Sequence, residues 1–360
     1  LKYYVQALDI AEETDNHHEE CNCLNGIGNA YFRLVNFEEA IKYQQRALDI
    51  ARTIGDRRAE SACLGSMGNT YFRLGQYHDA QQKYRQARDI SHEIGDRYNE
   101  GVVLGNLGEV YSRLGEYGEA HNYLNQALDI SCEIGDRFNE GNWLTNLGSV
   151  QRRQDHNQEA ASYYEQALAI FQKIGARAAE GAVLGFLARV YTSLGHREKA
   201  VETYQKAVQL EPHSPSLYNN LATRYLELGQ IEEAKSCYQR RIELRSDDAL
   251  TAYVNLGVIN IYQGNSTEAS KFFSKALDVF EVAKQRRLQT PADLLKNQAL
   301  ALLGLGQVEQ AIETLSEALS YSHDVDKNDL TLYDLLAKAS PTLRGFDEMS
   351  RLIERASTSS

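Results

Sequence analysis

The chain has 360 residues, of which 42% are hydrophobic and 24% are charged, and its formal net charge is −12. This acidic balance argues against non-specific binding to nucleic acid or anionic lipid, and no apolar run approaches the roughly 18 residues that a membrane span needs. The five cysteines are scattered and form no C-x-x-C pair, so the sequence predicts neither a disulfide framework nor a zinc site and favours a reducing, cytoplasmic setting.

Residues 1–14 form the first predicted element, a helix already under way at Leu1. We interpret it as the second helix of a truncated repeat, because Ala7 stands where later repeats carry an alanine, and we take the chain to be a piece of a longer protein. Without a first helix, Tyr4 and Leu8 lose part of their cover. We therefore expect this end to fray or to self-associate with a second copy.

Residues 15–210 contain five repeats with a period of 40 residues. In each repeat a small residue precedes a tyrosine by three positions, with Gln151 as the exception; the small residues are Gly28, Gly68, Gly108, Gly148 and Ala188. Apolar residues at helical spacing, such as Leu104, Leu107 and Tyr111, predict two amphipathic helices per repeat. Because such a pair cannot bury both faces alone, we expect the repeats to stack into a solenoid.

The repeats are joined by turns with the sequence I-G-D-R. A glycine such as Gly55 suits the end of a long second helix, and an aspartate such as Asp56 suits the N-cap of the next helix. Arginines and glutamates recur in register here, at Arg57, Arg97, Arg137 and Arg177 and at Glu60, Glu100, Glu140 and Glu180. We interpret them as structural ion pairs and helix-end charges, worth about 0–1 kcal/mol each if exposed.

Residues 211–322 continue the register as three repeats with shorter linkers. Ser214-Pro215 and Thr290-Pro291 each have the pattern of an N-cap followed by proline at the first helical position. Residues 323–360 predict capping helices and a tail, because the last unit of a solenoid needs its exposed face covered.

The repeat pattern resembles the tetratricopeptide repeat, in which a small residue is followed by tyrosine at plus 3, alanine at plus 12, an aromatic at plus 16 and alanine at plus 19. The stretch LYNNLATRYLELGQIEEAKSCY at 217–238 matches almost throughout, and the resemblance covers residues 1–322. It implies an all-α, right-handed superhelical solenoid of helix-turn-helix repeats that binds protein or peptide. The 40-residue variant is similar to spindle-orientation adaptors and to the C-terminal sensor arrays of bacterial signal-transduction (NB-ARC-like) ATPases.

If the repeats stack as in that family, the positions at minus 3, plus 1, plus 4 and plus 5 from the small residue face a concave groove. Polar residues recur there, at Asn29, Arg33, Asn69, Arg73, Arg113, Arg152, Arg153 and Arg189. Guanidinium groups pair with carboxylates, and asparagine amides can hydrogen-bond an extended peptide. We predict these eight residues as ligand-binding residues for an acidic peptide or protein segment. The alternative is a solvated face copied by duplication.

The same positions become apolar in the later repeats, at Leu226, Val258, Ile261, Tyr262, Leu300 and Leu303. This predicts an apolar second half of the groove. The alternatives are ordinary core packing and burial by the C-terminal segment. The lysine of the dicarboxylate clamp in chaperone-binding relatives has no counterpart, because its place is taken by Asn25, Gly65, Gly105, Thr145 and Gly185. Binding of chaperone tails is therefore disfavoured.

Catalytic patterns are absent: the glycine pairs belong to the repeat register, and no H-E-x-x-H occurs among the histidines. We predict no enzyme activity, no cofactor and no metal, and we interpret His17-His18 as a solvated pair. The first functional hypothesis is the sensor domain of a larger bacterial signalling or defence ATPase, in which a bound acidic segment shifts the resting state of the parent. The alternatives are a stand-alone adaptor scaffold that bridges two proteins, and an enzyme with an unrecognised site.

Overall fold

The computed structural model describes residues 1–245, 248–286, 291–321 and 351. These residues form 17 α-helices and no β-strands. By internal contacts the chain divides into two compact units, Leu1–Val190 and Tyr191–Ser360, each of which is described by itself. The division falls inside one helix. It differs from the change of repeat length after residue 210, so the domain boundaries drawn from the sequence stay a prediction.

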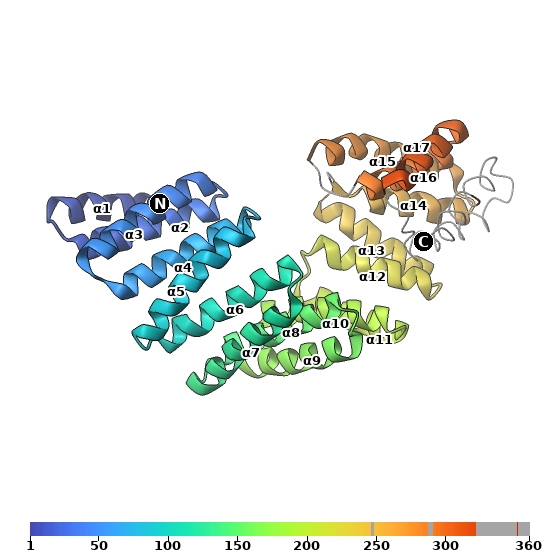
Figure 1. Ribbon diagram of the computed structural model, residues 1–360. Coiled ribbons are helices and arrows are strands. Elements are labelled where there is room, and N and C mark those ends of the chain that lie inside the picture. The colour runs from blue at the N-terminus through green and yellow to red at the C-terminus, as the bar shows by residue number, and fades with distance from the viewer. Residues whose placement is uncertain (246–247, 287–290, 322–350, 352–360) are drawn as a thin grey trace. The chain divides into compact units, whose positions relative to one another are not determined.

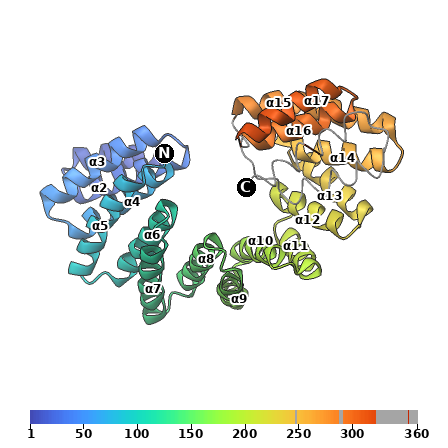
Figure 2. The same cartoon turned by 45° about the vertical axis from the view of Figure 1, so that its right-hand side comes forward.

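The first unit contains nine complete helices and most of a tenth. They are α1 (Lys2–Glu13), α2 (His17–Arg33), α3 (Phe37–Ile54), α4 (Arg57–Arg73), α5 (Tyr77–Glu93), α6 (Arg97–Leu114), α7 (Tyr117–Ile134), α8 (Arg137–Arg153), α9 (Asn157–Ile174) and α10 (Arg177–Ser193). Figures 1 and 2 show α2 to α9 as successive antiparallel pairs, in blue to green.

The turns between repeats have the local chemistry that the sequence predicts. Gly55 ends α3 in the left-handed conformation, with φ 73°, which costs glycine no side-chain clash. The carboxylate of Asp56 then accepts a hydrogen bond from the backbone N–H of Ala59 at 2.9 Å and caps α4. Asp96 and Asp136 cap α6 and α8 in the same way. These caps fix where each first helix begins, and therefore where its side chains point.

Packing within the first unit has two layers. The helices pair as α2 with α3, α4 with α5, α6 with α7 and α8 with α9, and α1, α3, α5 and α7 also pack on the next first helix. The first helices α2, α4, α6 and α8 contact one another directly. They therefore share one layer, and residues in register on them line a common face.

Close approach within each pair depends on the small residue of the repeat. A Cβ added at Gly68 would lie 2.5 Å from the ring of Tyr84, and one added at Gly108 would lie 2.5 Å from Leu124. Both partners are fully buried. Since real carbon atoms cannot approach so closely, the repeat needs glycine at these positions.

The leading helix α1 exposes several large apolar side chains. Tyr3 is 83% exposed and Ile10 is 61% exposed. Leu8, however, is buried together with Ala11, because α2 packs on α1, so the expected loss of cover at Leu8 is wrong. Self-association through this exposed face stays a prediction.

The second unit continues from the end of α10 with α11 (Arg197–Leu210), α12 (Pro215–Glu227), α13 (Ile231–Leu244), α14 (Leu250–Tyr262), α15 (Ser266–Arg286), α16 (Pro291–Gly304) and α17 (Val308–Tyr321). Consecutive helices pack against one another, and α14 also contacts α16. The predicted C-terminal capping helices, 323–360, lie outside the described residues except for residue 351.

Candidate functional site

The predicted groove arginines lie at the ends of the first helices. Arg33, Arg73, Arg113 and Arg153 belong to the last turns of α2, α4, α6 and α8, where a positive charge is favoured by the exposed carbonyl groups of the helix end. All four are exposed. Because the four helices form one layer, the arginines follow one another along a common face.

Three of the predicted residues line one pocket of about 210 Å³ in the first unit. The pocket is lined by Arg113, Arg152 and Arg153 together with Glu109, Ser112, Leu124, Thr145, Asn146, Ser149, Val150 and Phe186. Most of these occupy the predicted groove positions of α6 and α8. The pocket therefore lies between two successive first helices, and Phe186 of α10 contributes to its wall.

The charges of this pocket are largely uncompensated by the protein. Arg113 has one acidic neighbour, Glu109 on the same helix, at 3.6 Å, and both side chains are about 40% exposed (43% and 38%). Within the described part of the chain, Arg152 and Arg153 form no ion pair. Three guanidinium groups and one carboxylate leave the pocket with two net positive charges.

Arg33 and Arg73 do not line the pocket. The Arg73 guanidinium lies 5.6 Å from the centre of the Phe32 ring of the preceding repeat, and Arg113 lies 5.8 Å from the Phe72 ring in the same way. Such cation–π contacts orient a guanidinium group but leave its N–H groups free to bind an anion.

The predicted asparagines are partly engaged by the chain itself. The side-chain oxygen of Asn29 accepts a hydrogen bond from Gln44 at 3.2 Å, and that of Asn69 accepts one from the Tyr84 hydroxyl at 2.6 Å. Their amide groups are exposed, but these contacts fix their orientation. Arg189 is exposed on α10 and is not among the pocket residues.

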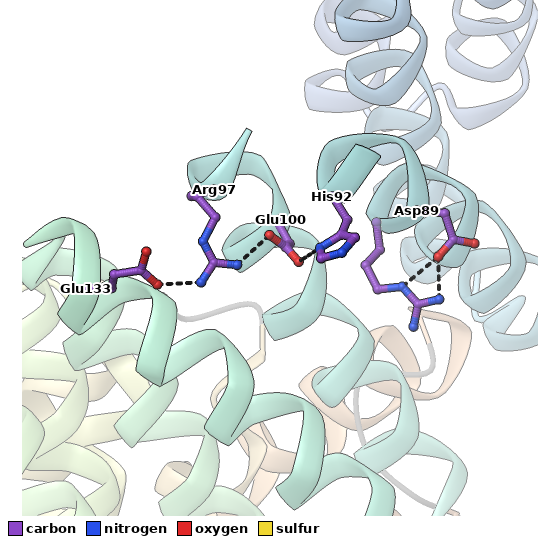
Figure 3. A network of polar contacts seen from close by, with 6 residues as sticks. Asp89, His92, Arg97, Glu100 and Glu133 are labelled. Atoms are coloured by element: carbon purple, nitrogen blue, oxygen red, sulfur yellow. Dashed lines mark hydrogen bonds and ion pairs between the residues drawn. The ribbon is translucent and has the colours of Figure 1, made fainter. Parts of the chain in front are cut away.

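Arginines of the second repeated set, at the turns, pair with glutamates, as Figure 3 shows for Arg97. Arg97 donates to Glu100 at 2.7 Å on its own helix and to Glu133 at 2.5 Å on α7, while His92 of α5 contacts Glu100 at 2.8 Å. Arg57 repeats the pattern with Glu60 and Glu93. The structural interpretation as ion pairs is thus confirmed for Arg57 with Glu60, Arg97 with Glu100 and Arg137 with Glu140.

The carboxylate of Glu60 has a shifted pKa. Burial acts to raise it, but hydrogen bonds from Arg52 and Arg57 outweigh burial, so the pKa of Glu60 lies below its ordinary value. Arg52 belongs to the preceding repeat and Arg57 to the same helix as Glu60. This buried acid therefore links two repeats in its charged form.

The apolar counterparts in the second unit do not form an open groove. Leu226, Val258, Leu300 and Leu303 are all buried, and of the six predicted residues only Tyr262 is strongly exposed, at 45%. The expectation of an apolar ligand surface is wrong at these four positions, because their side chains are buried. Of the two alternatives, core packing agrees with the contact between α14 and α16 at Val258, Leu300 and Leu303, whereas the C-terminal segment lies outside the described residues.

The two adjacent histidines near the start of the chain both contact acidic side chains. His17 and His18 contact Glu20 and Asp56, each at 3.0 Å. No group of three or more histidine, cysteine, aspartate or glutamate side chains in the described part could hold a metal ion. Among the same residues, no helix combines the length and apolarity that crossing a bilayer requires.

Sequence reasoning missed several pocket residues, notably Phe186 and Asn146. Both stand at minus 2 from the small residue, a position that the groove rule did not include. The equivalent residues of earlier repeats are Gly26, Ser66 and Asn106. The change to an aromatic residue in the fifth repeat could therefore have indicated Phe186 from the sequence. It marks the place where the next first helix closes one side of the pocket.

Comparison with solved structures gives similar folds at low identity. The chain matches BtubC from P. vanneervenii at 21% identity, covering 58% of this chain and 91% of that one, with a TM-score of 0.53. It matches the apo form of RapI at 19% identity, covering 67% and 90%, with a TM-score of 0.52.

A third match is a Signal Transduction ATPase with Numerous Domains, with a tetratricopeptide repeat sensor, from Pyrococcus horikoshii. The identity is 18% and the TM-score is 0.63. The match covers 97% of this chain and 52% of that protein, so the chain spans about half of its length.

Family models agree with the fold. No curated protein matches the sequence. Models described as tetratricopeptide repeat, however, match residues 1–53, 57–133, 139–210 and 248–324, and a further one matches 203–236. The predicted fold class, the all-α right-handed superhelical solenoid of this family, is confirmed, and each unit shows its consecutively packed hairpins. The chain therefore belongs to the tetratricopeptide repeat family.

Proposed function

We propose that this protein is a non-catalytic binding array whose first helices hold an acidic peptide or protein segment. Tetratricopeptide repeats are interaction scaffolds, so binding of protein or peptide follows from the family. The observation that supports an acidic ligand is the pocket between α6 and α8, in which Arg113, Arg152 and Arg153 meet with only Glu109 to oppose them. Arginine forks exposed in this way pair well with carboxylates.

The eight predicted residues divide into a pocket set and a flanking set in this proposal. Arg113, Arg152 and Arg153 hold the main anionic group. The flanking residues Asn29, Arg33, Asn69, Arg73 and Arg189 contact the rest of an extended segment. Since the chain as a whole is acidic, this face also steers such a segment away from the remaining surface.

The test is a charge reversal in the pocket, Arg113→Glu with Arg153→Glu. A short fluorescent peptide rich in aspartate and glutamate is the probe, and its isosteric Asn/Gln counterpart is the reference. We expect the double variant to bind the acidic peptide about tenfold more weakly or worse, and wild-type affinity to fall with added salt.

The matched control is Arg88→Glu with Arg46→Glu, on second helices outside the pocket. Arg88 pairs with its neighbour Asp89, and Arg46 lies near Glu12. Far-ultraviolet circular dichroism establishes that both double variants remain folded. If the pocket variant binds as wild type does, or if the acidic peptide binds no better than its neutral counterpart, the arginine pocket is not the contact surface.

For the wider role, we propose the sensor of a larger signalling or defence ATPase in the cytoplasm. The support is that nearly the whole chain, 97%, superimposes on a protein described as a signal transduction ATPase with a tetratricopeptide repeat sensor. In that setting a ligand changes the resting state only if it binds one state better. The alternative is an adaptor scaffold that joins two proteins. Sequencing the complete reading frame tests this. A phosphate-binding loop in the same reading frame would support the sensor, and its absence would support the adaptor.

A further inference from the structure

The pocket between α6 and α8 has the charge of a site for a doubly negative group. Its lining contains three guanidinium groups and one carboxylate, which leave two positive charges. Glu109 is no strong partner, because its carboxylate lies 3.6 Å from Arg113 and the contact is exposed. A single carboxylate ligand would leave one of these charges unbalanced, whereas a phosphate monoester carries about −1.5 to −2 at neutral pH.

The donors of the pocket also exceed what one carboxylate can use. Each arginine presents a planar fork of N–H groups, and the amide of Asn146 has no hydrogen-bond partner among the described residues. The donors come from opposite walls: Arg113 extends from α6, while Asn146, Arg152 and Arg153 extend from α8. Three terminal phosphate oxygens can accept from several directions at once, but the two oxygens of a carboxylate lie in one plane.

The surroundings favour one phosphate on a short segment over a long polyanion. Phe186, about one-third exposed at 36%, forms part of the wall and offers an apolar surface to the residue that carries the anion. Beyond the pocket the chain is acidic, with a net charge of −12, so a nucleic acid would meet repulsion along most of its length.

We propose that this pocket binds the phosphate group of a phosphorylated side chain in a peptide segment. The inference rests on the proposed function and sharpens it, because the acidic ligand is then created by phosphorylation. Arg113, Arg152 and Arg153 hold the phosphate, Asn146 donates to it, and Phe186 packs on the neighbouring residue. Binding consequently depends on the modification state of the partner.

The test uses the full chain and three peptide libraries with the same random flanks. The central residue is a phosphorylated serine, threonine or tyrosine in the first library, glutamate in the second and unmodified serine in the third. Retained peptides are identified by mass spectrometry, and the best sequence is synthesised in all three forms. We expect its phosphorylated form to bind about tenfold more tightly than the glutamate form, with no detectable binding of the serine form.

A matched pair of variants separates the pocket from the general charge of the groove. Arg152→Gln with Arg153→Gln removes two charges from the pocket, and Arg33→Gln with Arg73→Gln removes two from the same face outside it. We expect only the first pair to abolish the preference for phosphate over glutamate. The second pair is expected to weaken both peptides alike.

The pH dependence provides an independent readout. No histidine lines the pocket, and its charged groups are Arg113, Arg152, Arg153 and Glu109. Between pH 7.5 and 5.5 a phosphate monoester with its second pKa near 6 loses most of its second charge, so affinity should fall about fourfold. The glutamate peptide stays ionised over this range, and its affinity should hold.

The outcomes are distinct. Equal binding of phosphorylated and glutamate peptides overturns the phosphate inference and leaves the acidic-segment proposal standing. If neither the phosphorylated nor the glutamate library yields a bound peptide, the phosphate inference and the acidic-segment proposal are both overturned. Preference for a single-stranded oligonucleotide over every peptide, or equally strong competition by inorganic phosphate alone, also overturns the inference, because the ligand is then not a phosphorylated segment.

Discussion

Two columns of arginine in the first unit share a 40-residue period and differ in what surrounds them. The turn arginines Arg57 and Arg97 each donate to two glutamates, at distances of 2.5–2.7 Å. On the groove side, Arg113 has one acid at 3.6 Å and Arg153 forms no ion pair in the described part. Periodicity therefore marks both columns as repeated, but only the neighbours distinguish structural charges from charges available to a ligand.

The reason lies in the helix positions around each arginine. Arg57 and Arg97 each have a glutamate three residues further along the same helix and a second glutamate 36 residues later, on the paired helix. Four residues before the groove arginines stand Asn29, Asn69, Glu109 and Ser149, so only one of them has an acid on its own helix face.

The largest effect on stability should come from disrupting the close packing of the two helices of a repeat, on which both arginine columns depend. Gly108→Val places a branched side chain against Leu124 and within 3.2 Å of the Ala120 carbonyl oxygen, where the backbone cannot yield. We expect a loss of about 3 kcal/mol in the free energy of unfolding, measured by urea denaturation.

Gly118→Ala is its control, because nothing lies within 4 Å of a Cβ added there. This change should be neutral or stabilise by up to about 0.5 kcal/mol, since alanine orders a helix better than glycine does. Equal stability of the two variants would show that the close approach at Gly108 is not needed.

An intermediate effect on stability should follow from removing the glutamate that contacts one arginine of each column. Glu100 is buried, at 7% exposure, and contacts both Arg97 and His92, whereas Glu109 is exposed and contacts only Arg113. Glu100→Ala should lower the free energy of unfolding by about 1–3 kcal/mol, because it removes two hydrogen bonds between charged groups at a nearly buried position. Glu109→Ala should change it by less than about 0.5 kcal/mol. Both values are measured by urea denaturation. If Glu109→Ala lost more stability than Glu100→Ala, the assignment of Glu100 as structural and of the Arg113 charge as available to a ligand would be wrong.

The smallest effect concerns pH and the turn column alone. Glu60 has a folded-state pKa below its ordinary value of 4.5, so its contribution to stability is complete above that value and is lost as the pH falls through the folded pKa. The free energy of unfolding of wild type, measured with urea, should therefore fall on acidification from pH 5 towards pH 3. In Glu60→Gln this fall should be smaller. If the stability of the variant depended on pH between 5 and 3 as that of wild type does, Glu60 would not be the cause of the pH dependence.

Much of the fold was predictable from the sequence because its signals are local. The period, the small residue, the tyrosine and the turn caps act within one repeat, and Gly55 and Asp56 end and begin helices through their own backbone and side-chain geometry. The burial of Leu226 and Val258 was not predictable from their register positions, because it depends on how the helices of the second unit pack.

The sequence by itself determined the helical hairpins, their stacking register and the presence of two arginine columns, since each follows from residues a few positions apart. Only the tertiary structure decided which arginines are neutralised, which three meet in a pocket, and that Phe186 closes its wall. The physical reason is that pairing and pocket formation depend on distances between residues about 40 positions apart, which are set by packing between repeats.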